Sequence, residues 1–253
     1  MNVGPKILFL DTENAPNLAA TWGIHDQNVR YTDIVKEWFF ISGQWSWDNS
    51  KQVNTVSILD DAKRFKKDFT DDYHVVSTLH GVLEEADIVV GHNIIRHDIK
   101  KLLAKFIDHR LKPIKMPEVV DTLVWARKFG FQSRKLGDLC TKLGLSEKLH
   151  HEGGVFVKAA MGDRKAIHEI VTYGKGDITC VRELYHLLKP HCKHPNHNLF
   201  RGDGVECCPN CGSTEFIKRG HRLTSVGKFP SFSCNECGKY FQSGKSVKRV
   251  LMR

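Results

Sequence analysis

The stretch Ile7-Leu8-Phe9-Leu10-Asp11-Thr12-Glu13, near the start of the chain, decides the fold. Its apolar residues show no helical period, which is typical of a strand buried on both faces of a sheet. The strand ends in two carboxylates, Asp11 and Glu13, which are separated by Thr12. Because side chains alternate along a strand, we expect Asp11 and Glu13 to project to one face and Thr12 to point elsewhere. Two like charges so close repel each other and lose hydration, so they indicate either a divalent cation or the opening of a solvated loop.

Further apolar patterns place this strand in an α/β domain. They predict strands at residues 39–41, 53–58, 88–90 and 119–122, bounded by turn residues. Apolar residues at helical spacing predict helices at 75–85, 98–107, 136–144 and 163–188. The run 60–72 is charged and is expected to be solvated. Strands alternating with helices favour a sheet with helices packed against it.

Two more carboxylates are candidates for the same site. Asp98 falls in the first turn of a predicted helix, where it either caps the helix or directs its carboxylate toward the strand ends. Asp177 interrupts the apolar stripe of the helix at 163–188, and a carboxylate there must be paired, protonated or metal-bound. Gly174 and Gly176 each cost about 1 kcal/mol relative to Ala inside a helix. Their presence predicts that another backbone or a substrate approaches closely.

In their order along the chain, these segments resemble the motifs of the DEDD superfamily of 3′–5′ exonucleases, which includes polymerase proofreading domains and ribonuclease-D-like enzymes. Leu10-Asp11-Thr12-Glu13 resembles the first motif, and Gly91-His92-Asn93 followed by Asp98 resembles the second. Tyr173-Gly174-Lys175-Gly176-Asp177 resembles the tyrosine form of the third. The resemblance covers residues 5–188, including the intervening segments 120–123 and 134–136. His97 is a departure, because relatives commonly carry Phe there.

The resemblance implies a ribonuclease-H-like fold, a mixed sheet flanked by helices, and phosphodiester hydrolysis with two Mg²⁺ or Mn²⁺ ions. It implies that the ions are held by four carboxylates, those of Asp11, Glu13, Asp98 and Asp177. Tyr173 is then a catalytic residue that orients the attacking water, and Thr12 and Asn93 are expected to contact the substrate. The expected substrate is the 3′ end of a single strand, with DNA favoured. A 3′-end-trimming exoribonuclease and a non-catalytic nucleic-acid-binding protein are the alternatives.

Two Cys-x-x-Cys turns, each followed by glycine, lie near the C-terminus. Cys208 and Cys211 form the first turn, and Cys234 and Cys237 form the second. Thiolates in this pattern suit a tetrahedral Zn²⁺, and the spacing is similar to that of a zinc ribbon. Such a closed site predicts one structural Zn²⁺ rather than a catalytic one.

Other potential ligands stand close to these turns. Cys207 is a possible substitute for Cys208, and Cys192, His194 and His197 leave open a second metal ion. We favour a linker without metal for the segment that contains them.

The net charge of +9 is concentrated in the same region, because residues 186–253 hold 12 Lys and Arg against 4 Asp and Glu. A compact basic segment favours a nucleic acid as partner, the alternative being a solvated basic tail. Lys218, Arg219 and Arg222 are the expected contacts. The predicted organisation is an exonuclease domain at 1–188, a linker at 189–205 and a nucleic-acid-binding domain at 206–253 that is a small β-rich zinc ribbon. Replication or repair proteins are further expected partners.

The overall composition is that of a globular protein, with 41% hydrophobic and 26% charged residues. No apolar stretch approaches the length of a membrane span, and the first ten residues lack a basic segment followed by a long apolar one. We therefore expect a cytoplasmic protein with no membrane partner.

Overall fold

The structure is a computed structural model, and it describes residues 4–23, 25–146 and 153–250. By its internal contacts the chain divides into two compact units. The larger unit is Ile7–Leu184, and the smaller is Tyr185–Arg253 together with Met1–Lys6. The acidic motifs therefore belong to the larger unit, and the cysteine turns belong to the smaller one.

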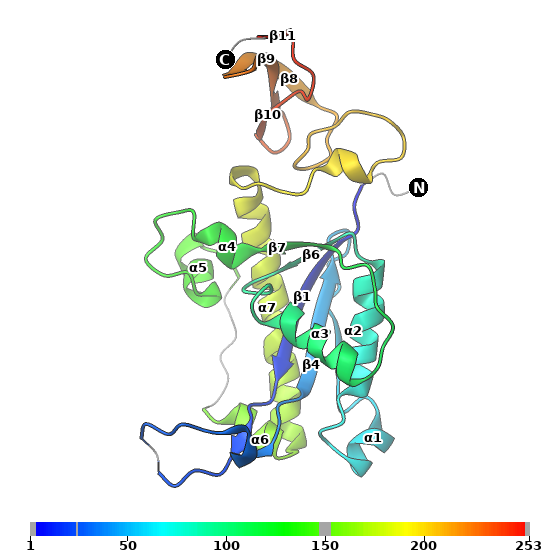
Figure 1. Cartoon of the computed structure of the whole chain (residues 1–253), viewed down its shortest axis with the longest axis vertical. Helices are drawn as coiled ribbons and strands as arrows, with labels where there is room; N and C mark the ends of the chain where they lie inside the picture. Colours follow the sequence, from blue (N-terminus) through cyan, green and yellow to red (C-terminus); the bar gives the residue numbers. More distant parts are fainter. Residues whose placement is uncertain (1–3, 24, 147–152, 251–253) are drawn as a thin grey trace. The chain divides into compact units, whose positions relative to one another are not determined.

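The larger unit is built on a five-stranded mixed sheet with the strand order β5-β4-β1-β6-β7 (Figure 1). The central strand β1 runs parallel to β6 and antiparallel to β4. β7 is parallel to β6, and β5 is antiparallel to β4. The strands are β1 (Ile7–Asn14), β4 (Phe40–Trp47), β5 (Asn54–Ser57), β6 (Ile88–Gly91) and β7 (Glu118–Asp121). The predicted ribonuclease-H-like α/β fold is confirmed, and a strand lies in each predicted region.

The central strand is as buried as its sequence predicts. Leu8 and Phe9 are fully buried, and Leu10 is 1% exposed. Burial of side chains of this size is worth about 1.5 to 3 kcal/mol each, so this strand contributes strongly to the core. The same burial fixes the register that carries Asp11 and Glu13 to the strand end.

Helices cover both faces of the sheet. A Cβ added to Gly43 of β4 would lie 2.6 Å from Leu79 of α2 (Tyr73–Glu85), whereas the next residue, Gln44, contacts Gly174 of α7 (Arg164–Leu188). Because neighbouring strand residues face opposite sides, α2 and α7 lie on opposite faces. The other helices are α1 (Ala62–Lys67), α3 (Asp98–Asp108), α4 (Thr122–Ala126), α5 (Leu136–Leu143) and α6 (Val155–Ala160).

All four predicted helices are present. Three short helices were not predicted, because α1, α4 and α6 span too few residues to show a helical period. The charged run at 60–72 thus includes a short exposed helix, but its last residue, Asp72, is buried, contrary to the expectation of a solvated run. A small hairpin, β2 (Leu18–Ala19) with β3 (Ile34–Lys36), and the 3-10 turn η1 (Tyr31–Asp33) stand between β1 and β4.

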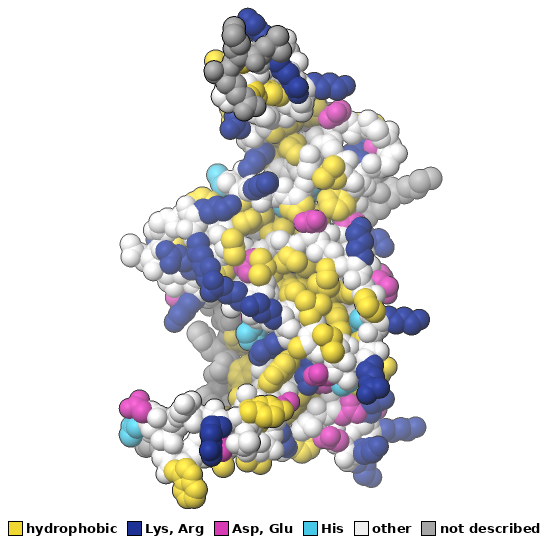
Figure 2. Space-filling model, viewed as in Figure 1, with side chains coloured by type: hydrophobic (Ala, Val, Ile, Leu, Met, Phe, Trp, Pro, Cys, Tyr) yellow, Lys and Arg dark blue, Asp and Glu magenta, His cyan; other side chains and the backbone are white. Residues whose placement is uncertain are grey.

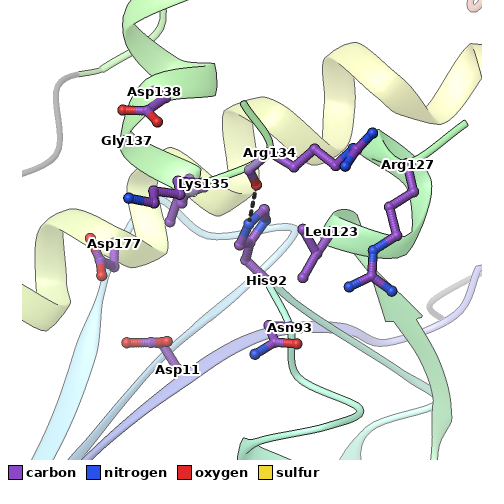
Figure 3. A pocket seen from close by; sticks show the side chains of 11 residues that line it. Asp11, His92, Asn93, Leu123, Arg127, Arg134, Lys135, Gly137, Asp138 and Asp177 are labelled. Atoms are coloured by element: carbon purple, nitrogen blue, oxygen red, sulfur yellow. Dashed lines mark hydrogen bonds between the residues drawn. The ribbon is translucent and has the colours of Figure 1, made fainter. Parts of the chain in front are cut away.

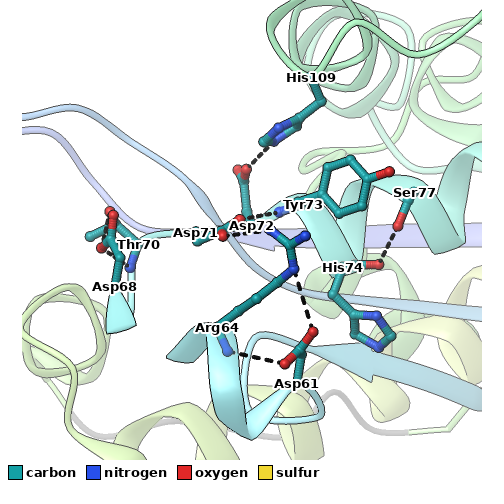
Figure 4. Close-up of polar contacts among 10 residues, drawn as sticks. All are labelled: Asp61, Arg64, Asp68, Thr70, Asp71, Asp72, Tyr73, His74, Ser77 and His109. Atoms are coloured by element: carbon teal, nitrogen blue, oxygen red, sulfur yellow. Dashed lines mark hydrogen bonds and ion pairs between the residues drawn. The ribbon is translucent and has the colours of Figure 1, made fainter. Parts of the chain in front are cut away.

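A buried carboxylate joins α2 and α3 to the sheet. Asp72, 1% exposed at the start of α2, accepts the backbone N–H of Phe40 at 2.9 Å. Lys105 Nζ lies 3.3 Å from the same oxygen, and the other oxygen of Asp72 lies 2.6 Å from His109 Nε2, as Figure 4 shows. A buried carboxylate is tolerated only when it is paired in this way. The cluster therefore fixes both helices against β4.

On the other face, Arg182 attaches α7 to the turn after β4. Its guanidinium donates to the carbonyls of Asp48 and Ser50, and to Ser46 Oγ at 3.1 Å. It also lies over the Phe9 ring, 5.5 Å from the ring centroid. These contacts set the position of α7 relative to β1, which matters because α7 carries Asp177.

The smaller unit contains the predicted β-rich region. Strand β9 (Gly227–Cys234) is central, and β8 (Phe216–Thr224) pairs along its length. β10 (Tyr240–Gln242) pairs with residues 231–233 of β9, and β11 (Lys248–Arg249) pairs with residues 227–228. Phe216, Phe232 and Phe241 pack with ring centroids 5.3 to 5.6 Å apart. These half-buried aromatic rings therefore join β8, β9 and β10 through one aromatic cluster. The segment before it holds the 3-10 turns η2 (Lys189–His191) and η3 (His197–Phe200).

Candidate active site and cysteine cluster

Three carboxylates meet at the end of β1. Asp11, Glu13 and Asp177 each offer an oxygen within 4.8 Å of the others. The alternation of the strand puts Asp11 and Glu13 on the face covered by α7, and the helix places Asp177 against them. Asp177 is 5% exposed, while Asp11 and Glu13 are half-buried.

This donor set suits a hard divalent cation. Three partly desolvated negative charges within one ion's reach repel each other, and a cation removes that repulsion. Oxygen ligands are those that Mg²⁺ and Mn²⁺ prefer. The residues present therefore fit the metal that the sequence motifs imply.

Asp98 is placed differently from the other three. Its Oδ1 accepts the Thr12 hydroxyl at 2.6 Å and the Thr12 backbone N–H at 3.1 Å. That N–H is available because the pairing of β1 with β6 ends at Phe9 and Val90. Burial raises the pKa of Asp98, and the hydrogen bond from the Thr12 side chain opposes this shift. Asp98 therefore lies at the open edge of β1, beside the cluster, and Thr12 contacts it directly.

Tyr173 stands four residues before Asp177 in the continuous helix α7, hence on the same helical face. Its side chain is half-buried. Between them, Gly174 brings α7 close to the sheet, because a Cβ at this position would lie 2.6 Å from Gln44 Cδ and Oε1. A close neighbour is present at Gly174 as predicted, but it is the side chain of Gln44 and not a backbone or a substrate.

A pocket of about 730 Å³ opens beside the carboxylates (Figure 3). It lies near the carboxyl ends of β1, β6 and β7, where sites gather in α/β sheets. Its lining combines three acidic residues, two of which belong to the carboxylate cluster, with basic residues from the α4–α5 region. The lining residues are Asp11, His92, Asn93, Leu123, Arg127, Arg134, Lys135, Leu136, Gly137, Asp138 and Asp177.

Asn93, expected to contact substrate, lines this pocket with a left-handed backbone, φ +66°. Asn tolerates this conformation better than most residues. Asp121, 3% exposed, accepts the Asn93 N–H at 2.9 Å and the Leu123 N–H at 2.9 Å, the latter at the start of α4. Asp121 was not predicted as a functional residue, because α4, which it caps, is too short to show a helical period.

His92 connects the loop after β6 to the α4–α5 region. Its Nδ1 lies 2.9 Å from Thr122 Oγ1, and its Nε2 lies 2.9 Å from the Arg134 carbonyl oxygen. Since a carbonyl oxygen only accepts, Nε2 donates to Arg134. His92 therefore fixes the backbone that carries Arg134 at the rim of the pocket.

In the smaller unit, Cys208, Cys211, Cys234 and Cys237 lie within 4.8 Å of one another. Sγ of Cys208 is 3.8 Å from that of Cys237, and Sγ of Cys211 is 3.6 Å from that of Cys234. Four sulfurs at about 2.3 Å from one tetrahedral Zn²⁺ would be about 3.8 Å apart, whereas a disulfide is about 2.05 Å long. The cluster therefore fits one Zn²⁺ and does not contain disulfides.

The backbone of both turns requires glycine. Gly212 and Gly238 have φ of +80° and +70°, a region that residues with a Cβ rarely adopt. The Cys211 thiol lowers the pKa of Cys208 to about 5, and the shared hydrogen bond raises the pKa of Cys211. The lowered pKa favours the thiolate form of Cys208, which is the form that binds a metal.

The other candidate ligands of the smaller unit do not converge. Among the described residues, only the two groups above bring three or more such side chains within ligand distance. Tyr185 and His194 are hydrogen bonded at 2.7 Å, while Cys192, His197 and Cys207 are buried. These residues therefore form neither a second metal site nor a site in which Cys207 takes the place of Cys208.

Lys218, Arg219 and Arg222 lie on β8, and all three are exposed. They belong to the smaller unit, whereas the acidic cluster belongs to the larger one. Across the described residues, no helix has the length and apolar character needed to cross a membrane.

One family model matches part of this chain. Residues 50–154 match the family model described as Exonuclease (RNase_T), a region that includes Asn93 and Asp98 but not Asp11, Glu13 or Asp177. A search of curated proteins found no match. The match supports a nuclease of the DEDD type, and hence a hydrolase that acts on nucleic acid.

Among solved structures, the chain is similar to the family B DNA polymerase from the hyperthermophilic archaeon Pyrobaculum calidifontis. The TM-score is 0.53 at 14% identity, over 74% of this chain and 25% of the polymerase chain. This chain thus spans about a quarter of the polymerase's length, and the likeness shows a shared fold.

Proposed function

We propose that the protein is a metal-dependent 3′–5′ exonuclease that hydrolyses single-stranded nucleic acid, with DNA favoured over RNA. The observation that carries the proposal is the meeting of Asp11, Glu13 and Asp177 within 4.8 Å beside an open pocket. The order of the motifs along the chain supports the direction of cleavage. The exonuclease match supports the class of substrate.

The carboxylates would hold two Mg²⁺ or Mn²⁺ ions, with Asp98 contributing at the edge of the site. Such ions activate an attacking water and stabilise the leaving oxygen in phosphodiester hydrolysis. We assign Tyr173 to orienting that water through its hydroxyl, since a phenol with a pKa near 10 is a poor base. Asn93 would contact the terminal nucleotide from the pocket wall.

In the smaller unit, the four cysteines would hold one structural Zn²⁺ and form a zinc ribbon. The basic side chains of β8 would then contact phosphates of the bound strand, and their charge would make binding salt-dependent. Removal of residues 205–253 is therefore expected to weaken binding more than turnover on short substrates. Cys208, Cys211, Cys234 and Cys237 have no part in the hydrolysis itself.

The deciding experiment compares matched DNA and RNA strands labelled at either end, incubated with the purified chain and Mg²⁺ or Mn²⁺. We expect a ladder shortened from the 3′ end. D11N and D177N should abolish hydrolysis while retaining the thermal transition of the wild type. D138N is the matched control, because Asp138 lines the same pocket outside the cluster and accepts the Ser133 hydroxyl. Full activity in D11N would reject the assignment.

Two other results would change the assigned function. Faster degradation of RNA would make the protein an exoribonuclease. Tight binding with no metal-dependent hydrolysis of either strand would make it a binding protein on a nuclease-like scaffold.

A further inference from the structure

The pocket beside the carboxylates has two chemically distinct ends. Asp11 and Asp177 lie together at one end, and Figure 3 shows Lys135 extending toward the side where Asp177 lies. The side chains of Arg127 and Arg134 lie on the other side, beyond His92 and Leu123. A ligand that spans the pocket would therefore meet carboxylates at one end and guanidinium groups at the other.

The two guanidinium groups at the other end are not paired with acids. Arg127 and Arg134 are exposed, and within the described ranges neither of them makes an ion pair. Figure 2 shows Lys and Arg side chains gathered over α4 and α5 on this face. Their uncompensated charge attracts anions to the pocket mouth.

The backbone beneath these side chains is held in place. The Arg134 carbonyl accepts from His92 Nε2 at 2.9 Å, and the Lys135 N–H donates to Ser133 Oγ at 3.3 Å. Arg127 is the C-cap residue of α4, whose N-terminus is capped by Asp121. The two guanidinium groups are thus carried by a fixed frame, which favours recognition at defined positions.

We propose that Arg127 and Arg134 form a subsite for the internucleotide phosphates of the strand next to the bond that is cut. Guanidinium groups match phosphate oxygens with paired hydrogen bonds, which ammonium groups do not. The scissile phosphate occupies the acidic end, and the strand continues over the cationic end. The subsite lies in the larger unit, so it is separate from the basic residues of β8. This inference rests on the proposed phosphodiester hydrolysis.

The test uses two substrates that differ in the number of phosphates. One is a single-stranded oligonucleotide, and the other is thymidine 5′-monophosphate p-nitrophenyl ester, which has one phosphodiester and nothing to occupy the subsite. The full-length variants are R127Q, R134Q and R127Q/R134Q. K128Q is the matched control, since Lys128 is the exposed neighbour of Arg127 and does not line the pocket.

We expect each single variant to lose about fivefold in oligonucleotide affinity at about 0.1 M salt, because one lost single-strand phosphate contact removes about 0.7 from the slope of log affinity against log salt. The double variant should lose about 25-fold, with a salt slope reduced by about 1.4. Hydrolysis of the single-phosphate ester and all properties of K128Q should stay at wild-type values.

Wild-type oligonucleotide affinity and salt slope in the double variant would overturn the subsite. An equal loss on the single-phosphate ester would also overturn it, because the arginines would then act on the site itself. An equal loss in K128Q would mean diffuse surface charge and no subsite. Failure of the wild type on both substrates would instead reject the proposed hydrolysis, so the two failures are distinguishable.

Discussion

Gly174 offers a direct test of how closely α7 must approach the sheet. In G174A the new methyl group would lie 2.6 Å from Gln44 Cδ and Oε1, and 2.9 Å from Nε2. Ordinary carbon contacts are about 3.5 to 4.0 Å, so the neighbours must separate by about 1 Å. Gln44 is fully buried, and its Nε2 donates to Ser42 Oγ at 2.8 Å. Moving its amide therefore strains a packed region, and part of the shift is expected in α7.

The energies of this substitution oppose each other. Overpacking costs about 1 to 3 kcal/mol, while replacing Gly by Ala inside a helix returns about 1 kcal/mol. We expect a net destabilisation of about 0 to 2 kcal/mol. Activity should fall much further, because Asp177 is one helical turn away and a misplacement of about 1 Å can cost about 100-fold in rate.

The assay combines urea unfolding with oligonucleotide hydrolysis. G81A is the matched control, because Gly81 lies inside α2 and an added Cβ meets nothing within 4 Å. G81A should gain about 1 kcal/mol and keep its activity. Q44A in the G174A background should restore activity by removing the obstructing amide. If G174A is as active as the wild type and gains the same stability as G81A, the reasoning is refuted.

Mn²⁺ at about 100 times its Kd should stabilise the wild-type chain by about 2.7 kcal/mol in thermal unfolding, and D177N should lose most of this gain. An equal gain in the wild type and in D177N would place the ion elsewhere. R182M should lose about 1.5 to 3 kcal/mol in urea unfolding, because the half-buried carbonyls of Asp48 and Ser50 lose a charged donor. An unchanged midpoint would show that Arg182 does not hold α7. A chelator should release one Zn²⁺ per chain and unfold the smaller unit. Hydrolysis of the single-phosphate ester should return to the wild-type rate once Mn²⁺ is restored. Release of Zn²⁺ without loss of structure would show that the ion is not needed for folding.

Much of the fold could be predicted from local sequence patterns. The apolar run from Ile7 to Leu10 predicted a buried central strand, and strand alternation put Asp11 and Glu13 on one face. The apolar stripe around Asp177 predicted a helix that packs its carboxylate inward. Two Cys-x-x-Cys turns predicted a four-sulfur cluster from spacing alone. Each of these features depends on residues close together in sequence, so periodicity and spacing were sufficient.

Other features were decided only when distant segments met. Asp98 bonds to Thr12 because the pairing of β6 with β1 stops early and leaves an N–H open. Gly174 faces a side chain of β4 because Gln44 pairs opposite Asp11 in the register of the sheet. The short helix α4 and the loop after it show no helical period, so nothing local brought Arg127 and Arg134 to the pocket. Sequence by itself thus determined the main strands and the longer helices, three clustered carboxylates and the four clustered cysteines. Tertiary packing decided which side chains surround them, because strand pairing and helix contacts join residues that no local period relates.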